Sequence, residues 1–460
     1  MNGNLVKALR LGPTPQLALV GSGGKTTALF QIARQLKPPV ILTTTTHLAV
    51  EQIHWGDRHI MISQMDDLQT FTDRLPPEVI VVTGQQVSGG RIVGLGQHLI
   101  RQLANMCAGK LPLLIEADGA RLRPLKAPGE HEPALPDFVS EVIVSAGLSA
   151  LGKPLTAEWV HRPEYFARLT GLQEGELITP QSLKQALLHP NGGLKGIPER
   201  ARPICILNQA DTPELQSFAG EMAASLLGAY QSVLVTSLSP GGLAGTSSNF
   251  ATPPMASRAV IYAVHEPVAG IVLAAGASRR LGQPKQLLDW KGKPLLRHIA
   301  EIALRSGLDP VIVVCGAAAA EIAPTLEGLA VQVVRNEAWQ SGQSTSIRAG
   351  VNALPQAAGA AVFFLSDQPN IPPALVRALV ETHQREMADI VAPLIDGQRG
   401  NPALFDRRLF DDLTRLQGDV GGRELFSRYP VSWVPWLDRR PLADIDTLAD
   451  YERLLAEEKD

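Results

Sequence analysis

Short apolar runs alternate with amphipathic segments along most of the chain. Between the first two runs, Leu29, Ile32, Ala33 and Leu36 recur at helical spacing, and the prolines at 38–39 end that segment. Apolar runs this short, separated by helices, are typical of buried strands in parallel sheets. The predicted strands of the first half span residues 17–20, 40–42, 79–82, 113–115, 142–144, 204–207 and 233–235.

The alternation stops at residues 238–258 and then restarts. This stretch is rich in Gly, Ser, Thr and Pro and has little periodicity, which is typical of a domain boundary. Beyond it a helix is predicted over 294–306, with Pro294 at its start and Gly307 after its end. We therefore expect an α/β protein with two three-layer α/β/α domains, 1–250 and 266–460, and a linker at 251–265. The predicted strands of the second domain span residues 270–273, 311–314, 331–334, 362–365 and 390–393.

The amino-acid composition and net charge limit the kinds of partner that this protein could bind. The 460 residues are 45% hydrophobic and 19% charged with a net charge of −3, which favours a soluble globular protein and argues against nucleic acid as a partner. The first residues lack the apolar core of a signal peptide and no apolar run reaches membrane-spanning length, so we expect a cytoplasmic protein with no membrane partner. Cys107, Cys205 and Cys315 lie far apart, so buried thiols are expected rather than a zinc site.

The segment LAAGASRRLGQPK at residues 273–285 carries a predicted strand into a loop with two glycines and three cations. Glycines let the backbone approach a ligand closely, and exposed amides hold phosphate oxygens. Arg279, Arg280 and Lys285 can neutralise several negative charges at once. The loop therefore predicts a triphosphate site, although it matches neither GxGxxG nor GK[ST].

A candidate metal ligand follows another predicted strand. Asp367 comes directly after the apolar run in FFLSDQP (363–369), at the edge where open α/β sheets bind ligands. A carboxylate there can hold Mg²⁺ against nucleotide phosphates, and Asp444 or Asp446 offers a second ligand. Asp367 could instead cap a turn beside Pro369, but the phosphate loop favours the metal role.

Six motifs of this half occur in the order of a known family. They are LAAGASRRLGQPKQLL, GQSTSIRAG (342–350), FLSDQP, RGNPALF (399–405), GDVGGREL (418–425) and DIDT (444–447). Over residues 266–455 the chain resembles the MobA-like nucleotidyltransferases, most of all molybdenum cofactor cytidylyltransferase. The resemblance implies a Rossmann-like domain that uses Mg²⁺ and transfers CMP from CTP to molybdopterin cofactor. Pyrophosphate and the cytosine dinucleotide form of the cofactor would be the products.

The same resemblance implies roles for single residues. Arg280 and Lys285 would steady the phosphates, while Asp367 and Asp446 would hold the metal. Ala275 favours CTP, because the guanylyl-transferring relatives tend to have LAGG where this chain has LAAG. The nucleotide would contact Leu273, Ala274, Ala275, Gly276 and Ser278. The acceptor would meet Arg399, Gly418, Asp419 and Arg423, unless these residues form only a surface glycine turn with solvated arginines.

A second glycine loop, VGSGGKTT (20–27), lies between a predicted strand and a predicted helix, as a phosphate loop does. The first glycine of GxxxxGK[ST] falls at Leu19, so the loop is tighter and more similar to that of Mur-type ligases. Lys25 would reach the β- and γ-phosphates, and Thr26 with Asp118 would serve a metal ion. A glycine turn with an exposed lysine is the alternative. The candidate nucleotide-binding residues are Gly21, Gly23, Gly24, Lys25, Thr26 and Thr27.

Other motifs surround this loop. Glu116 and Asp118 follow a predicted strand in LLIEADGAR (113–121), as the metal carboxylate of a Walker B strand does. In ILNQAD (206–211), Gln209 replaces the lysine of NKxD, so ATP and GTP both stay open as ligands. With TTTTH, EADGARLRPLKAPGEHEP and VHRPE, residues 15–250 resemble the accessory protein family of selenium-dependent molybdenum hydroxylases. That resemblance implies nucleotide binding and a role in cofactor maturation.

Together the two halves favour a bifunctional protein of molybdenum cofactor maturation. Its N-terminal domain would bind a nucleotide and assist cofactor modification or delivery to an apo molybdenum hydroxylase. A nucleotidyltransferase that uses GTP or acts on another phosphorylated acceptor is one alternative. A cofactor carrier or chaperone switched by a nucleoside triphosphate is another.

Overall fold

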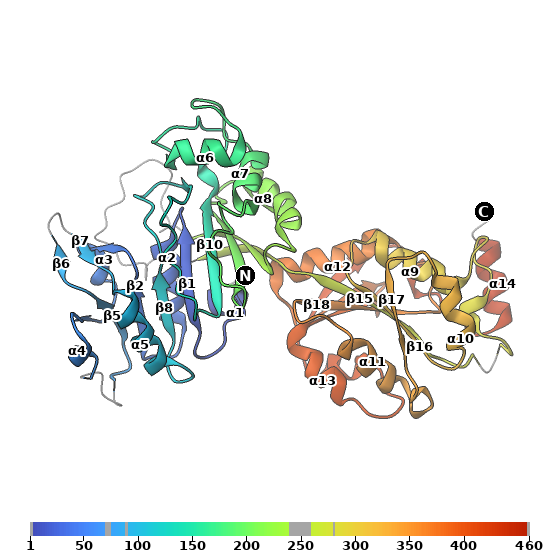
Figure 1. Ribbon diagram of the computed structural model, residues 1–460. Helices are drawn as coiled ribbons and strands as arrows, with labels where there is room; N and C mark the ends of the chain where they lie inside the picture. The colour runs from blue at the N-terminus through green and yellow to red at the C-terminus, as the bar shows by residue number, and fades with distance from the viewer. Residues whose placement is uncertain (1–2, 70–74, 88–90, 239–258, 279–280, 458–460) are drawn as a thin grey trace. The chain divides into compact units, whose positions relative to one another are not determined.

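The computed structural model describes residues 3–69, 75–87, 91–238, 259–278 and 281–457 (Figure 1). The chain divides into two compact units, Met1–His265 and Glu266–Asp460. Part of the predicted linker is structured, because Val260–His265 forms strand β14 of the first unit. Within the described residues, no helix has the length and apolar composition needed to cross a bilayer.

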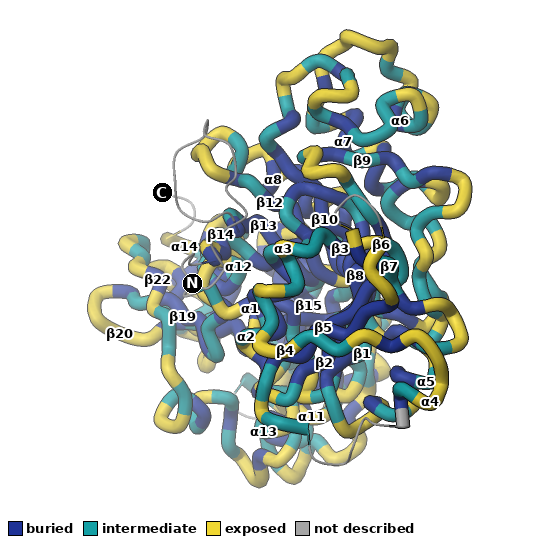
Figure 2. The backbone as a smooth tube through the Cα atoms, turned by 90° about the vertical axis from the view of Figure 1, so that its left-hand side faces the viewer, coloured by how far each residue is buried: buried dark blue, intermediate teal, exposed yellow. Residues whose placement is uncertain are grey.

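The first unit is built on a nine-stranded sheet that contains all seven predicted strands. Every neighbouring pair is parallel except β13 and β14, which are antiparallel. All residues of β2, β5 and β8 are buried, as Figure 2 shows in dark blue. The order is β14 (Val260–His265), β13 (Ser232–Ser237), β12 (Arg202–Asn208), β10 (Glu141–Gly147), β1 (Gln16–Gly21), β8 (Leu113–Glu116), β2 (Val40–Thr44), β5 (Val79–Thr83) and β4 (Arg58–Met61).

Strand order reverses at β1, which lies between β8 and β10. Such a switch point opens a crevice at the carboxyl ends of the strands, where open α/β sheets bind ligands. Helix α2 starts there and contacts β1, β2 and β8, with Leu29 and Ile32 fully buried. The α-helices of this unit are α1 (Leu5–Ala8), α2 (Lys25–Gln35), α3 (Val50–Ile53), α4 (Met65–Gln69), α5 (Gln97–Cys107), α6 (Pro163–Thr170), α7 (Pro180–Leu188) and α8 (Pro213–Leu226).

Two small sheets flank the crevice. One joins β3 (His47–Ala49), β7 (Arg91–Val93) and β6 (Gln86–Val87), all antiparallel. The other pairs β9 (Leu125–Lys126) with β11 (Val160–His161) in parallel. Both bring residues far apart in sequence to the mouth of the main sheet.

The second unit has a mixed sheet of eight strands. Its β15, β16, β17 and β18 are parallel, as predicted, but β21 runs antiparallel between β18 and β19, so the sheet is not purely parallel. The order is β17 (Val331–Arg335), β16 (Val311–Cys315), β15 (Val268–Ala274), β18 (Ala360–Leu365), β21 (Ala403–Asp406), β19 (Ile390–Ile395) and β20 (Gln398–Arg399), with β22 (Val431–Trp436) also paired to β19.

Helices cover both faces of this sheet (Figure 1). Alternate residues of β15 face opposite cores: Val272 packs with α9 and α12, and Ile271 packs with α11 and α13. This is the three-layer α/β/α arrangement expected from the sequence. The helices are α9 (Leu295–Arg305), α10 (Ala319–Ile322), α11 (Gln343–Asn352), α12 (Pro373–Glu386), α13 (Phe410–Arg415) and α14 (Leu448–Glu457).

All three cysteines are buried, as predicted. Burial raises the pKa of Cys107 to about 12 and that of Cys315 to about 11. Because the thiolate is the reactive form, Cys107 and Cys315 are not suited to act as nucleophiles at neutral pH.

The crossing of α11 over β15 depends on a glycine. A Cβ at Gly350 would lie 2.7 Å from Ile271 Cγ2, so an added methyl group overpacks this contact. Gly350→Ala should therefore be at least about 1 kcal/mol more destabilising in the wild-type protein than in an Ile271→Ala background, where space has been created. Urea unfolding of the four proteins in the double-mutant cycle measures this coupling; additive effects would contradict the packing described.

Candidate functional site

The glycine loop of the first unit connects β1 to α2 through three left-handed glycines. Gly21, Gly23 and Gly24 have φ values of 94°, 71° and 115°, which residues with a side chain rarely adopt. A Cβ on Gly23 would lie 2.4 Å from the backbone nitrogen of Gly147, so this glycine is also required by space. Gly24 is the N-cap of α2, so the loop leads directly into the amides of the first helical turn.

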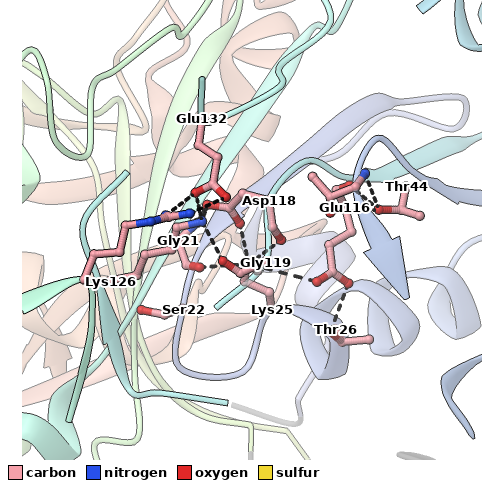
Figure 3. A network of polar contacts seen from close by, with 12 residues as sticks. Gly21, Ser22, Lys25, Thr26, Thr44, Glu116, Asp118, Gly119, Lys126 and Glu132 are labelled. Carbon is pink, nitrogen blue, oxygen red and sulfur yellow. Dashed lines mark hydrogen bonds and ion pairs between the residues drawn. The ribbon is translucent and has the colours of Figure 1, made fainter. Parts of the chain in front are cut away.

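Lys25 is almost completely buried and is held from three directions (Figure 3). Its Nζ forms an ion pair with the Asp118 carboxylate and donates to the Gly21 carbonyl at 2.8 Å and the Asp118 carbonyl at 2.7 Å. Asp118 Oδ2 also accepts from the Gly21 amide at 2.9 Å. The lysine is thus fixed beside the loop with its charge balanced.

A second lysine extends this network. Lys126 Nζ lies 2.8 Å from Asp118 Oδ2 and 2.6 Å from Glu132 Oε2, and Arg162 also binds Glu132 at 2.6 Å. Although burial opposes ionisation, the hydrogen bonds from Arg162 and Lys126 lower the pKa of Glu132 to about 2. The chain of alternating charges ties β9 and β11 to the loop.

Thr26 meets Glu116 rather than Asp118. Its Oγ1 donates to Glu116 Oε2 at 2.9 Å, whereas both oxygens of Asp118 have partners in the lysine network. Burial raises the pKa of the Glu116 carboxyl, and Lys25 at 4.0 Å opposes that rise. Among the described residues, Glu116 is therefore better placed than the predicted Asp118 to meet a cation beside Thr26. Glu116 ends β8 and Asp118 lies two residues later, so the sequence could not distinguish them.

The NQAD motif is hydrogen-bonded to the glycine loop through Asn208. Asn208 is buried, and its Nδ2 donates to the Gly23 carbonyl at 2.5 Å. Its Oδ1 accepts from Thr236 Oγ1 at 3.0 Å. The next residue, Gln209, lines the cleft and accepts a bond of 2.7 Å from Ser149 Oγ.

A cleft of about 840 Å³ lies in front of this loop. Residues 22–27 form its floor, so all the predicted loop residues reach it except Gly21, which lines a neighbouring cavity. The rest of the lining includes Glu116, which comes directly after a predicted strand, and residues that were not predicted as site residues. These are Trp55, Arg91, Arg121, Arg123 and Arg162.

In the second unit, Gln286 anchors the loop that leaves β15. Its side chain is fully buried, and Nε2 donates to the carbonyls of Ala274 at 2.9 Å and Gly276 at 3.1 Å. Ser278, in a left-handed conformation with φ of 49°, accepts from the Lys285 amide at 3.0 Å. These bonds fold the loop back so that Lys285 points to the end of β18. Arg279 and Arg280 lie outside the described residues.

Lys285 joins two of the predicted metal ligands. Its Nζ lies 2.6 Å from Asp367 Oδ2 and 3.7 Å from Asp446 Oδ1. The other oxygen of Asp367 is buried without a hydrogen-bond partner among the described residues. Burial raises the pKa of Asp444, and the charges of Asp446 and Asp367 raise it further. An unpartnered carboxylate oxygen inside an acidic group fits a bound cation.

No group of three His, Cys, Asp or Glu side chains is arranged as a ready metal cage anywhere in the described part of the chain. This does not conflict with magnesium, which is commonly held by one or two carboxylates together with substrate phosphates. Asp367 and Asp446 could supply those carboxylates in the second unit.

A cleft of about 590 Å³ surrounds Lys285 and Asp367. Of the predicted nucleotide contacts, Leu273, Ala275, Gly276 and Ser278 line it, whereas the side chain of Ala274 is buried. Of the predicted acceptor contacts, Asp419 lines it. Gly418 instead packs against α11, where its carbonyl accepts from Ser344 Oγ at 2.7 Å. Arg423 is exposed, and Arg399 lies over the Phe426 ring at 4.6 Å; neither lines the cleft.

Comparison with known proteins assigns each unit to a family. Residues 17–164 match the YqeC protein family, and residues 270–433 match the MobA-like NTP transferase domain. The protein YqeC of Escherichia coli (strain K12) is 32% identical over 196 residues, which cover 42% of this chain and 75% of that protein.

Two relatives match the second unit over nearly their whole length. Nicotine blue oxidoreductase of Paenarthrobacter nicotinovorans is 30% identical over 197 residues, covering 41% of this chain and 96% of that protein. A Bacillus cytotoxicus protein named "Probable molybdenum cofactor guanylyltransferase" is 25% identical over 199 residues, covering 41% of this chain and 96% of that protein. The second unit has a lysine and carboxylates at the edge of a Rossmann-like sheet, and it belongs to the MobA-like NTP transferases. The first unit belongs to the YqeC family.

Proposed function

We propose that the second unit transfers CMP from CTP to the terminal phosphate of molybdopterin cofactor. The first unit binds ATP or GTP and assists modification of the cofactor or its delivery to a molybdenum hydroxylase. The observation that carries the transferase role is the contact of Lys285 with Asp367 where β15 and β18 end. A lysine beside a carboxylate, next to a glycine loop, suits a triphosphate with its metal ion.

The proposed reaction is a displacement at phosphorus. An oxygen of the acceptor phosphate attacks the α-phosphorus of CTP, the bond from that phosphorus to the bridging oxygen breaks, and pyrophosphate leaves. Such reactions depend on positioning and charge neutralisation more than on a nucleophile from the protein. A magnesium ion on Asp367 and Asp446 would neutralise the triphosphate, while Lys285 would steady the leaving pyrophosphate. Asp419 and the start of α11 would position the acceptor.

The base and the acceptor are inferred from the LAAG motif and from the name of one relative. Ala275 lines the cleft and favours CTP over GTP through the LAAG motif. The name of the Bacillus cytotoxicus relative supports molybdenum cofactor as the acceptor, whereas the word guanylyltransferase in that name keeps GTP as the alternative nucleotide. Another phosphorylated acceptor would use the same lysine and carboxylates.

In the first unit, nucleotide binding is supported by the loop that leads into α2. Its amides and Lys25 would hold the phosphates, and Thr26 with Glu116 would meet the metal ion. The nucleotide could be hydrolysed or could act as a switch in a carrier. Nucleotide turnover measured on variants of each site distinguishes these two roles.

Asp367→Ala should lower pyrophosphate release by at least about a hundredfold, because it removes the proposed metal carboxylate and leaves Lys285 without its partner. The measurement uses the full-length protein with Mg²⁺, CTP and molybdopterin cofactor, and circular dichroism checks the fold. Asp411→Ala, at an exposed carboxylate of the same unit, is the matched control. Lys25→Ala should also keep wild-type release. Wild-type turnover by Asp367→Ala would contradict the assignment.

Glu116→Gln should stabilise the ligand-free protein increasingly as pH rises. Because the folded-state pKa of Glu116 is raised, its stabilising contribution is complete below the unfolded pKa and is lost as pH rises towards the folded value. Glutamine does not ionise, so the difference in unfolding free energy should grow above about pH 4.5 and then level off. Urea unfolding at several pH values measures it, with the exposed Glu158→Gln as control. A pH-independent difference would show that Glu116 ionises in the folded protein as it does in the unfolded chain.

A further inference from the structure

The cleft of the first unit has cations beyond those of the phosphate loop. Lys25 is balanced by Asp118, and Arg162 by Glu132. Three more arginines line the same cleft and have no hydrogen bond or ion pair from their side chains to the residues that the structure describes. They are Arg91, Arg121 and Arg123. Unbalanced guanidinium groups in a cleft attract anions.

One of these arginines, Arg123, and the proline after it are hydrogen-bonded through their backbone to the phosphate loop and to Gly147. The Arg123 carbonyl accepts from the Gly23 amide at 3.3 Å, and the Pro124 carbonyl accepts from Ser22 Oγ and from the Gly147 amide, both at 2.8 Å. The chain at Arg123 and Pro124 is therefore fixed beside the phosphate loop. Arg121 lies two residues earlier, and both arginines line the cleft.

The neighbouring wall is electropositive as well. His161 on β11 lines the cleft, and its pKa is lowered to about 4 by burial and by the charges of Arg162, Lys126 and Arg121. The imidazole is thus neutral at pH 7, because burial and the nearby positive charges disfavour its protonation. This wall favours an anionic ligand without needing a protonated histidine.

The cleft of the first unit extends beyond the phosphate loop. It measures about 840 Å³, and its lining reaches from residues 22–27 to Arg91, Arg121 and Arg123. The loop amides, Lys25 and a metal ion beside Thr26 already account for a triphosphate. Arg121 and Arg123 are additional to that set.

We propose that the first unit binds a second anionic ligand on Arg121 and Arg123, next to the nucleotide. The ligand class is a phosphate monoester or a similar dianion, because the planar guanidinium group matches phosphate with two parallel hydrogen bonds. This subsite rests on the proposed nucleotide role of the loop. It makes the first unit a site where a nucleotide and a phosphorylated compound lie side by side.

The test measures binding of inorganic phosphate to the full-length protein by calorimetry, after loading with Mg²⁺ and a non-hydrolysable imido analogue of ATP or GTP. The analogue fills the position of the γ-phosphate, so further phosphate needs a separate site. The double variant Arg121→Ala, Arg123→Ala should raise the phosphate Kd at least tenfold while changing analogue affinity less than twofold. Arg101→Ala, at an exposed arginine of the same unit paired with Asp137, should leave both unchanged.

Three other outcomes would contradict either the second subsite or the nucleotide role of the loop. If the analogue binds in a Lys25-dependent way but phosphate does not bind, or binds equally to the double variant, the second subsite is wrong. If the double variant loses the analogue instead, the arginines serve the nucleotide itself and the subsite is again wrong. If the wild-type protein binds neither analogue, or Lys25→Ala binds as well as wild type, the proposed nucleotide role fails and the subsite falls with it.

Discussion

Both sites depend on one contact, between a lysine carried by a glycine-rich loop and a carboxylate carried by the neighbouring parallel strand. In the first unit β1 pairs with β8 so that Leu19 lies opposite Glu116. In the second unit β15 pairs with β18 so that Leu273 lies opposite Leu365. Paired parallel strands end at the same edge of the sheet. The loop after one strand and the carboxylate after its neighbour are therefore brought together by the pairing itself.

The two contacts differ in their surroundings. The side chains of Lys25 and Asp118 are only 3% and 2% exposed, whereas those of Lys285 and Asp367 are 15% and 18% exposed. Breaking a fully buried pair by removing one partner typically costs about 3–5 kcal/mol, so the first contact holds its loop firmly. The second contact leaves one oxygen of Asp367 without a hydrogen-bond partner among the described residues. The carboxylate of the second contact is therefore the more open to a metal ion.

Much of this arrangement follows from the sequence because it is local. Each predicted strand lies within an observed one, since short buried runs between helices have few other conformations available. Lys285 and Asp367 were predicted to act together, and both line one cleft. The roles assigned to them, and to the loop of the first unit, stay predictions that experiment must test.

What the sequence did not reveal depends on contacts between distant segments. β14 follows a Gly- and Pro-rich stretch and is recognised as a strand only by its antiparallel pairing with β13. The antiparallel placement of β21 likewise depends on the return path of the chain. Glu116 and Asp118 are two residues apart, and only the turn after β8 sends one to Thr26 and the other to Lys25. Arg121 resembles any exposed arginine until the fold shows that it lines the cleft.

The most direct test of the account is the nucleotide dependence of pyrophosphate release by the full-length protein with Mg²⁺ and molybdopterin cofactor. CTP, GTP and ATP are compared at equal concentration, and the dinucleotide product is identified by mass. The account predicts release with CTP that far exceeds release with GTP or ATP, with one cytosine dinucleotide formed per pyrophosphate. Preference for GTP would contradict the role of Ala275 while keeping nucleotidyl transfer. No release with any of the three would contradict the proposed acceptor and the transferase reaction on it.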